Sequence, residues 1–120
     1  MTFQGTVTAT LFSKDGNEII GQTSLDVSVR GGDLNSFNLS LFVNASQVSP
    51  WNPVGYGHPN LYYFQIRFSY ASDPDTSTEK TIRIGFREVE LVQDPLPGGS
   101  SFYFRVNGVK IWAKGANWIP

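Results

Sequence analysis

Residues 102–112 read FYFRVNGVKIW, and this stretch decides the fold class. Apolar and polar residues alternate on both sides of Asn107-Gly108, a dipeptide that favours a two-residue type I′ turn because both positions accept a positive φ. The stretch therefore predicts a β-hairpin. Its predicted cross-strand pairs are Val106 with Val109 and Phe104 with Ile111 on one face, and Tyr103 with Trp112 on the other.

The same two-residue period recurs along most of the chain. It is clear in residues 6–12, 23–30, 36–43, 61–70 and 79–93, and Gly, Pro, Asp and Asn turns separate these segments. In 36–43 the period places Phe37, Leu39 and Leu41 on one face. No segment has the period of a helix. About seven short strands of this kind predict an all-β fold, an immunoglobulin-like antiparallel β-sandwich.

One strand pattern contains an irregularity. In residues 79–93 the apolar positions shift from even to odd numbers between Phe86 and Val89. A shift of one residue is typical of a β-bulge or a strand bend, and Gly85 makes such a kink easier.

Composition limits the function classes. The 120 residues are enough for one domain with a core, and the formal net charge is −1. The basic residues are scattered from Lys14 to Lys114, so no patch for nucleic acid is predicted. No apolar run is long enough to span a membrane, and the first residues lack the features of a signal peptide. Cysteine is absent, which excludes a disulfide but does not identify the compartment.

Two glutamates are candidates for acid–base chemistry. Glu88 and Glu90 lie two residues apart on a predicted strand, so their Cα atoms are about 6.6 Å apart on one face. Glycosidases use carboxyl pairs about 5 to 9.5 Å apart. Such a pair needs two different environments, however, and the sequence offers none. A solvated pair is the favoured interpretation.

Other polar groups carry weaker signals. Asp73, Asp75 and Glu79 could offer oxygen ligands to calcium, but the segment lacks the glycine and the final glutamate of an EF-hand loop. An acidic turn is favoured, and no metal or cofactor is predicted. His58 is the only histidine and is interpreted as a turn residue. Asn38 and Asn44 begin short glycosylation sequons that matter only in a secretory pathway.

The aromatic residues leave alternatives open. Trp51, Tyr56, Trp112 and Trp118 could form a sugar-stacking platform, which would make the chain an autonomous carbohydrate-binding module. Large aromatic residues more often serve packing and interfaces, which favours Trp51 and Tyr56 as packing residues of the 50–60 crossover. A further alternative is an adhesion-type sandwich whose partner is another protein.

Three segments together resemble one family. WNPVGYGHPNLY (51–62), the segment from Gly85-Phe86-Arg87 to the Asn-Gly hairpin, and GANWIP (115–120) are similar to family 2 glycoside hydrolases. The last of these looks like the β-mannosidase branch. The resemblance covers about residues 48–120. Asn52 departs from the pattern, because mannosidases often repeat the tryptophan at this position.

The resemblance implies an accessory role. In this family a sugar-binding-like domain precedes an immunoglobulin-like sandwich, and a (β/α)8 barrel with both catalytic glutamates follows. Residues 1–113 resemble the sandwich and 114–120 the first barrel strand, which we expect to be disordered here. The parent enzyme would be a retaining exo-β-mannosidase that removes terminal β-D-mannose. No position matches a catalytic residue, so this chain alone is expected to be inactive.

The resemblance also implies partners and positions. The partners would be the catalytic barrel and the N-terminal sugar-binding-like domain of the same chain, and mannoside substrate would be reached only through the parent. Asn117 and Trp118 would lie near substrate, while Phe86, Arg87 and Trp112 would contact the barrel. The location would be lysosomal or secreted in a eukaryote, and cytoplasmic or periplasmic in a bacterium.

Overall fold

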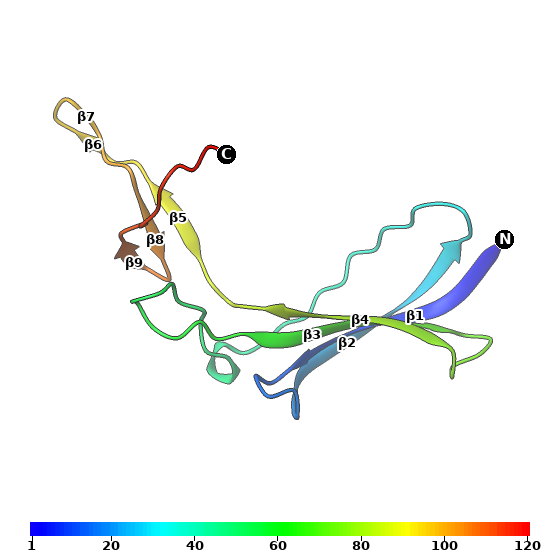
Figure 1. The fold of residues 1–120 in the computed structure, drawn as a ribbon. Helices are drawn as coiled ribbons and strands as arrows, with labels where there is room; N and C mark the ends of the chain where they lie inside the picture. The colour runs from blue at the N-terminus through cyan, green and yellow to red at the C-terminus, as the bar shows by residue number, and fades with distance from the viewer. The chain divides into compact units, whose positions relative to one another are not determined.

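The fold was obtained as a computed structural model that describes residues 1–120 (Figure 1). It is all-β with antiparallel pairing, which confirms the predicted fold class and is consistent with a β-sandwich. The number of strands is nine, counting two very short ones. The elements are β1 (Thr2–Phe12), β2 (Ile19–Arg30), a 3-10 turn (Ala45–Gln47), β3 (Tyr62–Tyr70), β4 (Ser77–Ile84), β5 (Val89–Val92), β6 (Pro95–Leu96), β7 (Gly99–Ser100), β8 (Tyr103–Val106) and β9 (Val109–Ile111).

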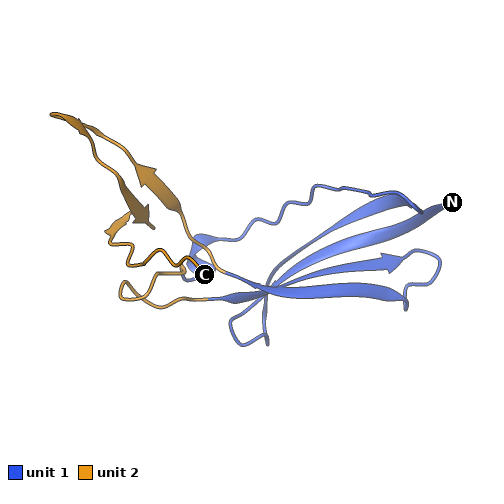
Figure 2. Cartoon of the chain, turned by 45° about the horizontal axis from the view of Figure 1, so that its top comes forward, with its two compact units in different colours: residues 1–49, 61–84 blue, residues 50–60, 85–120 orange.

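The chain forms two compact units (Figure 2). Unit 1 comprises residues 1–49 and 61–84, and unit 2 comprises residues 50–60 and 85–120. Unit 1 holds a four-stranded sheet in the order β2-β1-β3-β4. Unit 2 holds a three-stranded sheet in the order β5-β8-β9 and the small β6-β7 hairpin. The structure contains no helix with the length and apolar character needed to cross a bilayer.

The sheet of unit 1 has one apolar and one polar face, as its alternating sequence predicts. Val7 in β1 lies opposite Leu25 in β2 and Phe68 in β3 on the apolar face. The polar face is joined by cross-strand hydrogen bonds, among them Thr6 to Asp26 at 2.9 Å. The core of this unit consists of the buried side chains Ala9, Leu11, Val27 and Tyr62.

Gly5 allows β1 and β3 to approach closely. A Cβ atom at this position would lie 2.5 Å from both the Phe68 ring and the Ser69 carbonyl oxygen. Because real Cβ atoms essentially never come so near to main chain, only glycine fits here without moving β3. Phe68 in turn packs edge-on against Tyr70, with ring centroids 4.9 Å apart.

The predicted strand at 36–43 is wrong, since this segment has no ladder partner. The side chain of Asn35 accepts a hydrogen bond from Arg30 N and donates one to Arg30 O. These two bonds satisfy the main-chain polar groups of the last residue of β2. The predicted alternation of faces persists only in part in the exposure pattern. Leu39 and Leu41 are half-buried and Phe42 is exposed, but Phe37, predicted to share the face of Leu39 and Leu41, is exposed as well.

The β8-β9 hairpin has the predicted register within its ladder, but the predicted pair of Tyr103 with Trp112 is not part of it, because β9 ends at Ile111. Phe104 pairs with Ile111 and Val106 with Val109. Asn107 has a φ of 52° and Gly108 a φ of 79°, and a type I′ turn requires positive values at both positions. The β6-β7 hairpin was not predicted, although Pro97-Gly98 with its positive glycine φ of 83° is a recognisable turn signal.

The shift of period in residues 79–93 is a break between two strands rather than a bulge within one. β4 ends at Ile84 and β5 begins at Val89, and they belong to different sheets. The intervening main chain bonds elsewhere, because Phe86 O accepts a hydrogen bond from Trp51 N at 2.8 Å. Gly85 is needed for close packing, since its Cβ would lie 2.9 Å from Trp51 Cβ.

Candidate functional site

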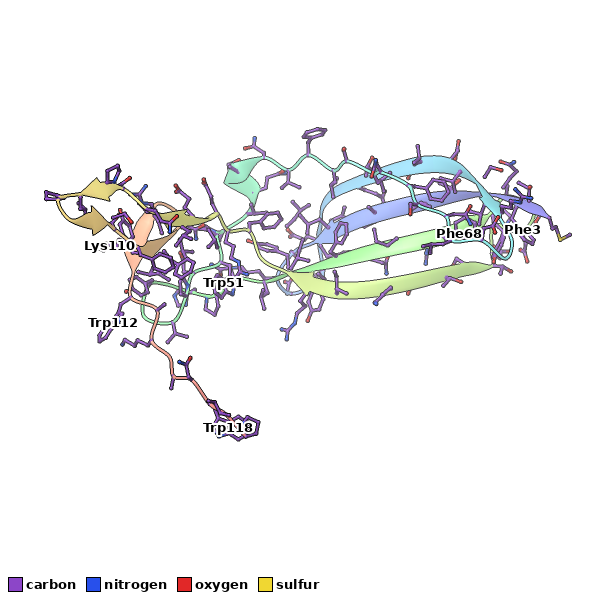
Figure 3. The ribbon with its side chains drawn as sticks, turned by 90° about the horizontal axis from the view of Figure 1, so that it is seen from above. Phe3, Trp51, Phe68, Lys110, Trp112 and Trp118 are labelled. Atoms are coloured by element: carbon purple, nitrogen blue, oxygen red, sulfur yellow. The ribbon has the colours of Figure 1, made fainter.

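Most of the residues singled out from the sequence lie in unit 2, around the 50–60 crossover and the β8-β9 hairpin. Figure 3 labels Trp51, Lys110 and Trp112 there, with Trp118 on the segment that follows. Three features define this region, namely a hydrogen-bonded centre at Asn107, a packed Trp51, and an exposed aromatic surface on the hairpin.

The centre is the side chain of Asn107. Its amide nitrogen donates to Trp51 O at 2.7 Å and to Asn52 Oδ1 at 3.1 Å. Its side-chain oxygen accepts from Glu88 N at 3.0 Å, and its main-chain N–H donates to Glu88 O at 2.9 Å. One turn residue therefore joins the crossover, the segment before β5 and the hairpin.

Asn52 is part of the same network. Its side-chain oxygen accepts from Asn107, and its main-chain N–H donates to His58 O at 3.1 Å. A tryptophan at this position would have no side-chain oxygen to accept a hydrogen bond from Asn107. The departure from the mannosidase pattern at Asn52 is thus matched by a specific hydrogen bond.

Trp51 is a packing residue of this unit. It forms an isolated bridge with Pro59 and lies against Gly85. The guanidinium carbon of Arg87 lies 4.6 Å from the centroid of the Trp51 ring, a cation–π distance. Phe86 and Arg87, two of the predicted interface residues, are therefore engaged within unit 2. Their contact with another domain stays a prediction.

Trp112, the third predicted interface residue, is 75% exposed. Its main-chain N–H donates to the Tyr56 hydroxyl at 2.9 Å, which ties the end of the hairpin to the crossover. A groove runs between these two segments. Its lining residues are Pro53, Val54, Gly55 and Tyr56 on one side and Ile111, Trp112, Ala113 and Lys114 on the other.

Cations lie over the aromatic rings of the hairpin. Lys110 Nζ is 4.6 Å from the centroid of the Tyr103 ring, and Lys114 Nζ is 5.5 Å from that of Trp112. Arg105 donates to the Tyr103 hydroxyl at 3.2 Å and forms a long ion pair of 3.9 Å with Glu90. Aromatic and basic side chains therefore lie in contact on the hairpin and the segment that follows it.

The carboxylates of the chain show no catalytic arrangement. Glu90 is paired with Arg105, and Glu79 is paired with Arg67 at 3.1 Å. Asp73 accepts a hydrogen bond from the hydroxyl of Thr76. The structure contains no group of three or more His, Asp or Glu residues placed to hold a metal ion.

The remaining candidates lie on exposed segments. Asn38 is exposed, and Asn44 caps the 3-10 turn by accepting from Ser46 N at 3.1 Å. Asn117 and Trp118 belong to no strand, and Trp118 is 85% exposed. The position of Asn117 and Trp118 near a substrate and the domain boundary at residue 113 stay predictions.

Sequence reasoning missed the network at Asn107. From the sequence, Asn107 was identified only as a turn residue, a role that Gly or Asp could also fill. The available signal was the choice of asparagine, since its amide can donate and accept at once while its main chain tolerates a positive φ.

The family model that matches the chain is that of the glycosyl hydrolases family 2, over residues 2–87. The match covers well over half of the chain and includes all of unit 1 except Met1.

The chain is also similar to curated proteins that are named β-mannosidases. A β-mannosidase B of Aspergillus clavatus is 37% identical over 108 residues, which is 90% of this chain and 12% of that protein. The β-mannosidases of Rattus norvegicus and Bos taurus are 43% identical over 75 residues and 39% identical over 87 residues, covering 61% and 68% of this chain. The chain spans about a tenth of the length of these relatives.

Proposed function

Because this chain belongs to glycosyl hydrolases family 2, we propose that it is a non-catalytic accessory domain of a β-mannosidase. The observation that carries the proposal is the similarity to a β-mannosidase B over 90% of this chain but only 12% of that relative. A match that covers nearly all of one protein and a small part of the other is typical of a domain within a larger enzyme.

The parent enzyme would be a retaining hydrolase of terminal, non-reducing β-D-mannose. Its catalytic carboxylates would lie in a barrel that follows the sandwich and begins near residue 114. Active sites of such barrels lie at the carboxyl ends of the strands, which is why Asn117 and Trp118 are proposed to lie near substrate. The sandwich would position this barrel.

The polar groups of the chain support a non-catalytic role. Glu90 forms an ion pair of 3.9 Å with Arg105, and the main chain at Glu88 is hydrogen-bonded to Asn107. These are structural contacts, and neither glutamate has a partner that would make it an acid and the other a nucleophile.

A carbohydrate-binding module has no comparable support. The relatives are named as β-mannosidases, and the family model is that of hydrolases. Within the chain, Trp51 offers no free platform because Arg87 lies over its ring.

The test is an activity comparison between the full-length parent protein and the 120-residue chain. Both are assayed with a chromogenic aryl β-D-mannoside, and the matching β-galactoside and β-glucuronide serve as controls. We expect the parent to hydrolyse the mannoside in preference to both controls and the chain alone to hydrolyse none of the three. NMR of the first sugar released should show the β-anomer, as retention requires. Preference for another glycoside, or activity of the chain alone, would refute the proposal.

A further inference from the structure

The strand β4 forms one edge of the four-stranded sheet of unit 1, where it is the outermost, yellow-green strand in Figure 3. Two main-chain hydrogen bonds at the end of β3 show which groups of this edge lack a partner. Ala71 N donates to Gln4 O of β1, whereas Tyr70 N donates to Thr76 O beside β4. Because the bonding direction alternates along a strand, the even-numbered residues of β4 bond to β3 and the odd-numbered ones point outward. The N–H and C=O groups that are available at the edge belong to Ser77, Glu79, Thr81 and Arg83.

The side chains at this edge include an unpaired cation and a carboxylate with an unpaired oxygen. Arg83 is exposed and forms no ion pair, hydrogen bond or cation–π contact. Glu79 accepts two hydrogen bonds from Arg67, at 3.3 and 3.1 Å, and both reach its Oε2 atom. Its Oε1 atom has no partner. Glu79 and Arg83 lie on the same face of the sheet, because successive residues of a strand alternate between the two faces.

The charges of β4 are complementary to those of a second copy of the same strand. Charged residues on an edge strand commonly prevent pairing with another chain. An antiparallel copy centred on Thr81, however, places Glu79 of each copy opposite Arg83 of the other. This register also opposes odd-numbered residues to odd-numbered residues, so the available main-chain groups of the two edges meet. The same contact occurs twice, once on each side of a twofold axis.

Neighbouring registers lack this complementarity. Centring the pair on Lys80 brings two Lys80 side chains together, and centring it on Ile82 leaves no charged residue of β4 opposite another. One step further in either direction, two Glu79 or two Arg83 side chains lie opposite each other. Opposite charges that face each other across two strands stabilise a sheet, and like charges destabilise it. Of these five registers, only the one centred on Thr81 pairs opposite charges within β4.

The other face of β4 gains apolar contact in the same register. Lys80 lies opposite Ile82 of the other copy, and Ile82 is 47% exposed. An apolar groove runs along this side of β3 and β4, and its lining includes Phe64, Ile66, Phe68 and Ile82. The aliphatic stem of Lys80 can cover the groove of the other copy while its ammonium group stays in water.

We infer that β4 is a self-association edge, through which two copies of the protein pair antiparallel about Thr81 and form one continuous sheet. The partner is a second copy because β4 itself carries both members of each contact, Glu79 with Arg83 and Lys80 with Ile82. This self-association goes beyond the proposed function and is independent of the sugar that the parent enzyme hydrolyses.

Sedimentation equilibrium of the full-length protein tests the charge contacts. R83E places a carboxylate opposite Glu79 at both contacts, and E79R places a guanidinium opposite Arg83. We expect each variant alone to dimerise at least about tenfold more weakly than the unaltered protein. An equimolar mixture of the two variants should dimerise again, because each contact of a mixed pair joins one positive to one negative side chain.

The matched control for these variants is K80E. It reverses a charge on the same strand, but no charged residue lies opposite this position in the inferred register, so it should weaken dimerisation far less than R83E. A monomeric unaltered protein, charge variants that dimerise like it, or a mixture that stays monomeric would each overturn the inference.

Zero-length cross-linking gives a second measurement that needs no disruptive variant. R83K keeps the positive charge and provides an amine, which a carbodiimide joins to a carboxylate only when the two are in contact. Residues 79 and 83 of one copy are about 13 Å apart along the strand, so a link between these positions requires two copies. In a mixture of isotope-labelled and unlabelled full-length protein, we expect mass spectrometry to find this link between labelled and unlabelled chains. Absence of the link, or links from position 83 only to carboxylates beyond residue 120, would refute self-association through β4.

Discussion

The side-chain amide of Asn107 donates a hydrogen bond of 2.7 Å to the main-chain carbonyl of Trp51, 56 residues earlier in the chain. This bond connects the tip of the β8-β9 hairpin to the 50–60 crossover. The same side chain binds Glu88 N, so the segment before β5 is held as well. One polar residue in a turn therefore joins three separate segments of unit 2.

Replacement of Asn107 should destabilise unit 2 in a graded way. Asn107→Gly keeps the positive φ but loses three side-chain hydrogen bonds, which should lower the free energy of unfolding by about 2–3 kcal/mol. Asn107→Asp should cost more, because a carboxylate would face the oxygens of Trp51 and Asn52. Urea unfolding followed by tryptophan fluorescence measures both, with exposed Asn38→Asp as the control. An aspartate variant as stable as the glycine variant would contradict this.

Much of the fold follows from local pattern. The hairpin register was predictable because Asn107-Gly108 fixes both the turn type and the pairing around it. The absence of a strand at 36–43 was not predictable, because the alternation of this segment is that of a strand. In the structure, the main-chain polar groups of Arg30 bond to the side chain of Asn35 instead. The contacts of Asn107 with Trp51 and of Gly85 with Trp51 join distant segments, and no local pattern encodes such pairings.

Asn52 and Asn107 should be energetically coupled. Asn52→Ala removes the acceptor of one Asn107 hydrogen bond and should cost about 1 kcal/mol. In a double-mutant cycle with Asn107→Gly, we expect the two losses to sum to more than the double variant shows, by at least about 0.5 kcal/mol. The cycle needs the unfolding free energies of the four proteins. Strict additivity would mean that the 3.1 Å contact contributes nothing.

Gly5→Ala should be among the most harmful single-methyl changes in unit 1. The added Cβ would lie 2.5 Å from the main-chain oxygen of Ser69, so β3 must shift away from β1. We expect a loss of about 1–3 kcal/mol in unfolding free energy, the range for overpacking. Gly99→Ala is the matched control, because a Cβ there meets nothing within 4 Å. Thermal unfolding of the two variants gives the comparison, and equal stability would show that the approach at Gly5 is looser than described.

Asp15 should titrate below its ordinary pKa of 3.8, because the Ser13 hydroxyl and then the Asn17 main-chain N–H donate to its carboxylate. A lowered pKa in the folded state stabilises the β1-β2 turn above the unfolded pKa, and this stabilisation is lost as the pH falls through the folded value. Ser13→Ala removes the larger cause and should raise the pKa towards 3.8. The measurement is the ¹³C shift of the Asp15 carboxyl carbon between about pH 2 and pH 6. A midpoint that Ser13→Ala leaves unchanged would mean that the hydroxyl does not bind the charged carboxylate.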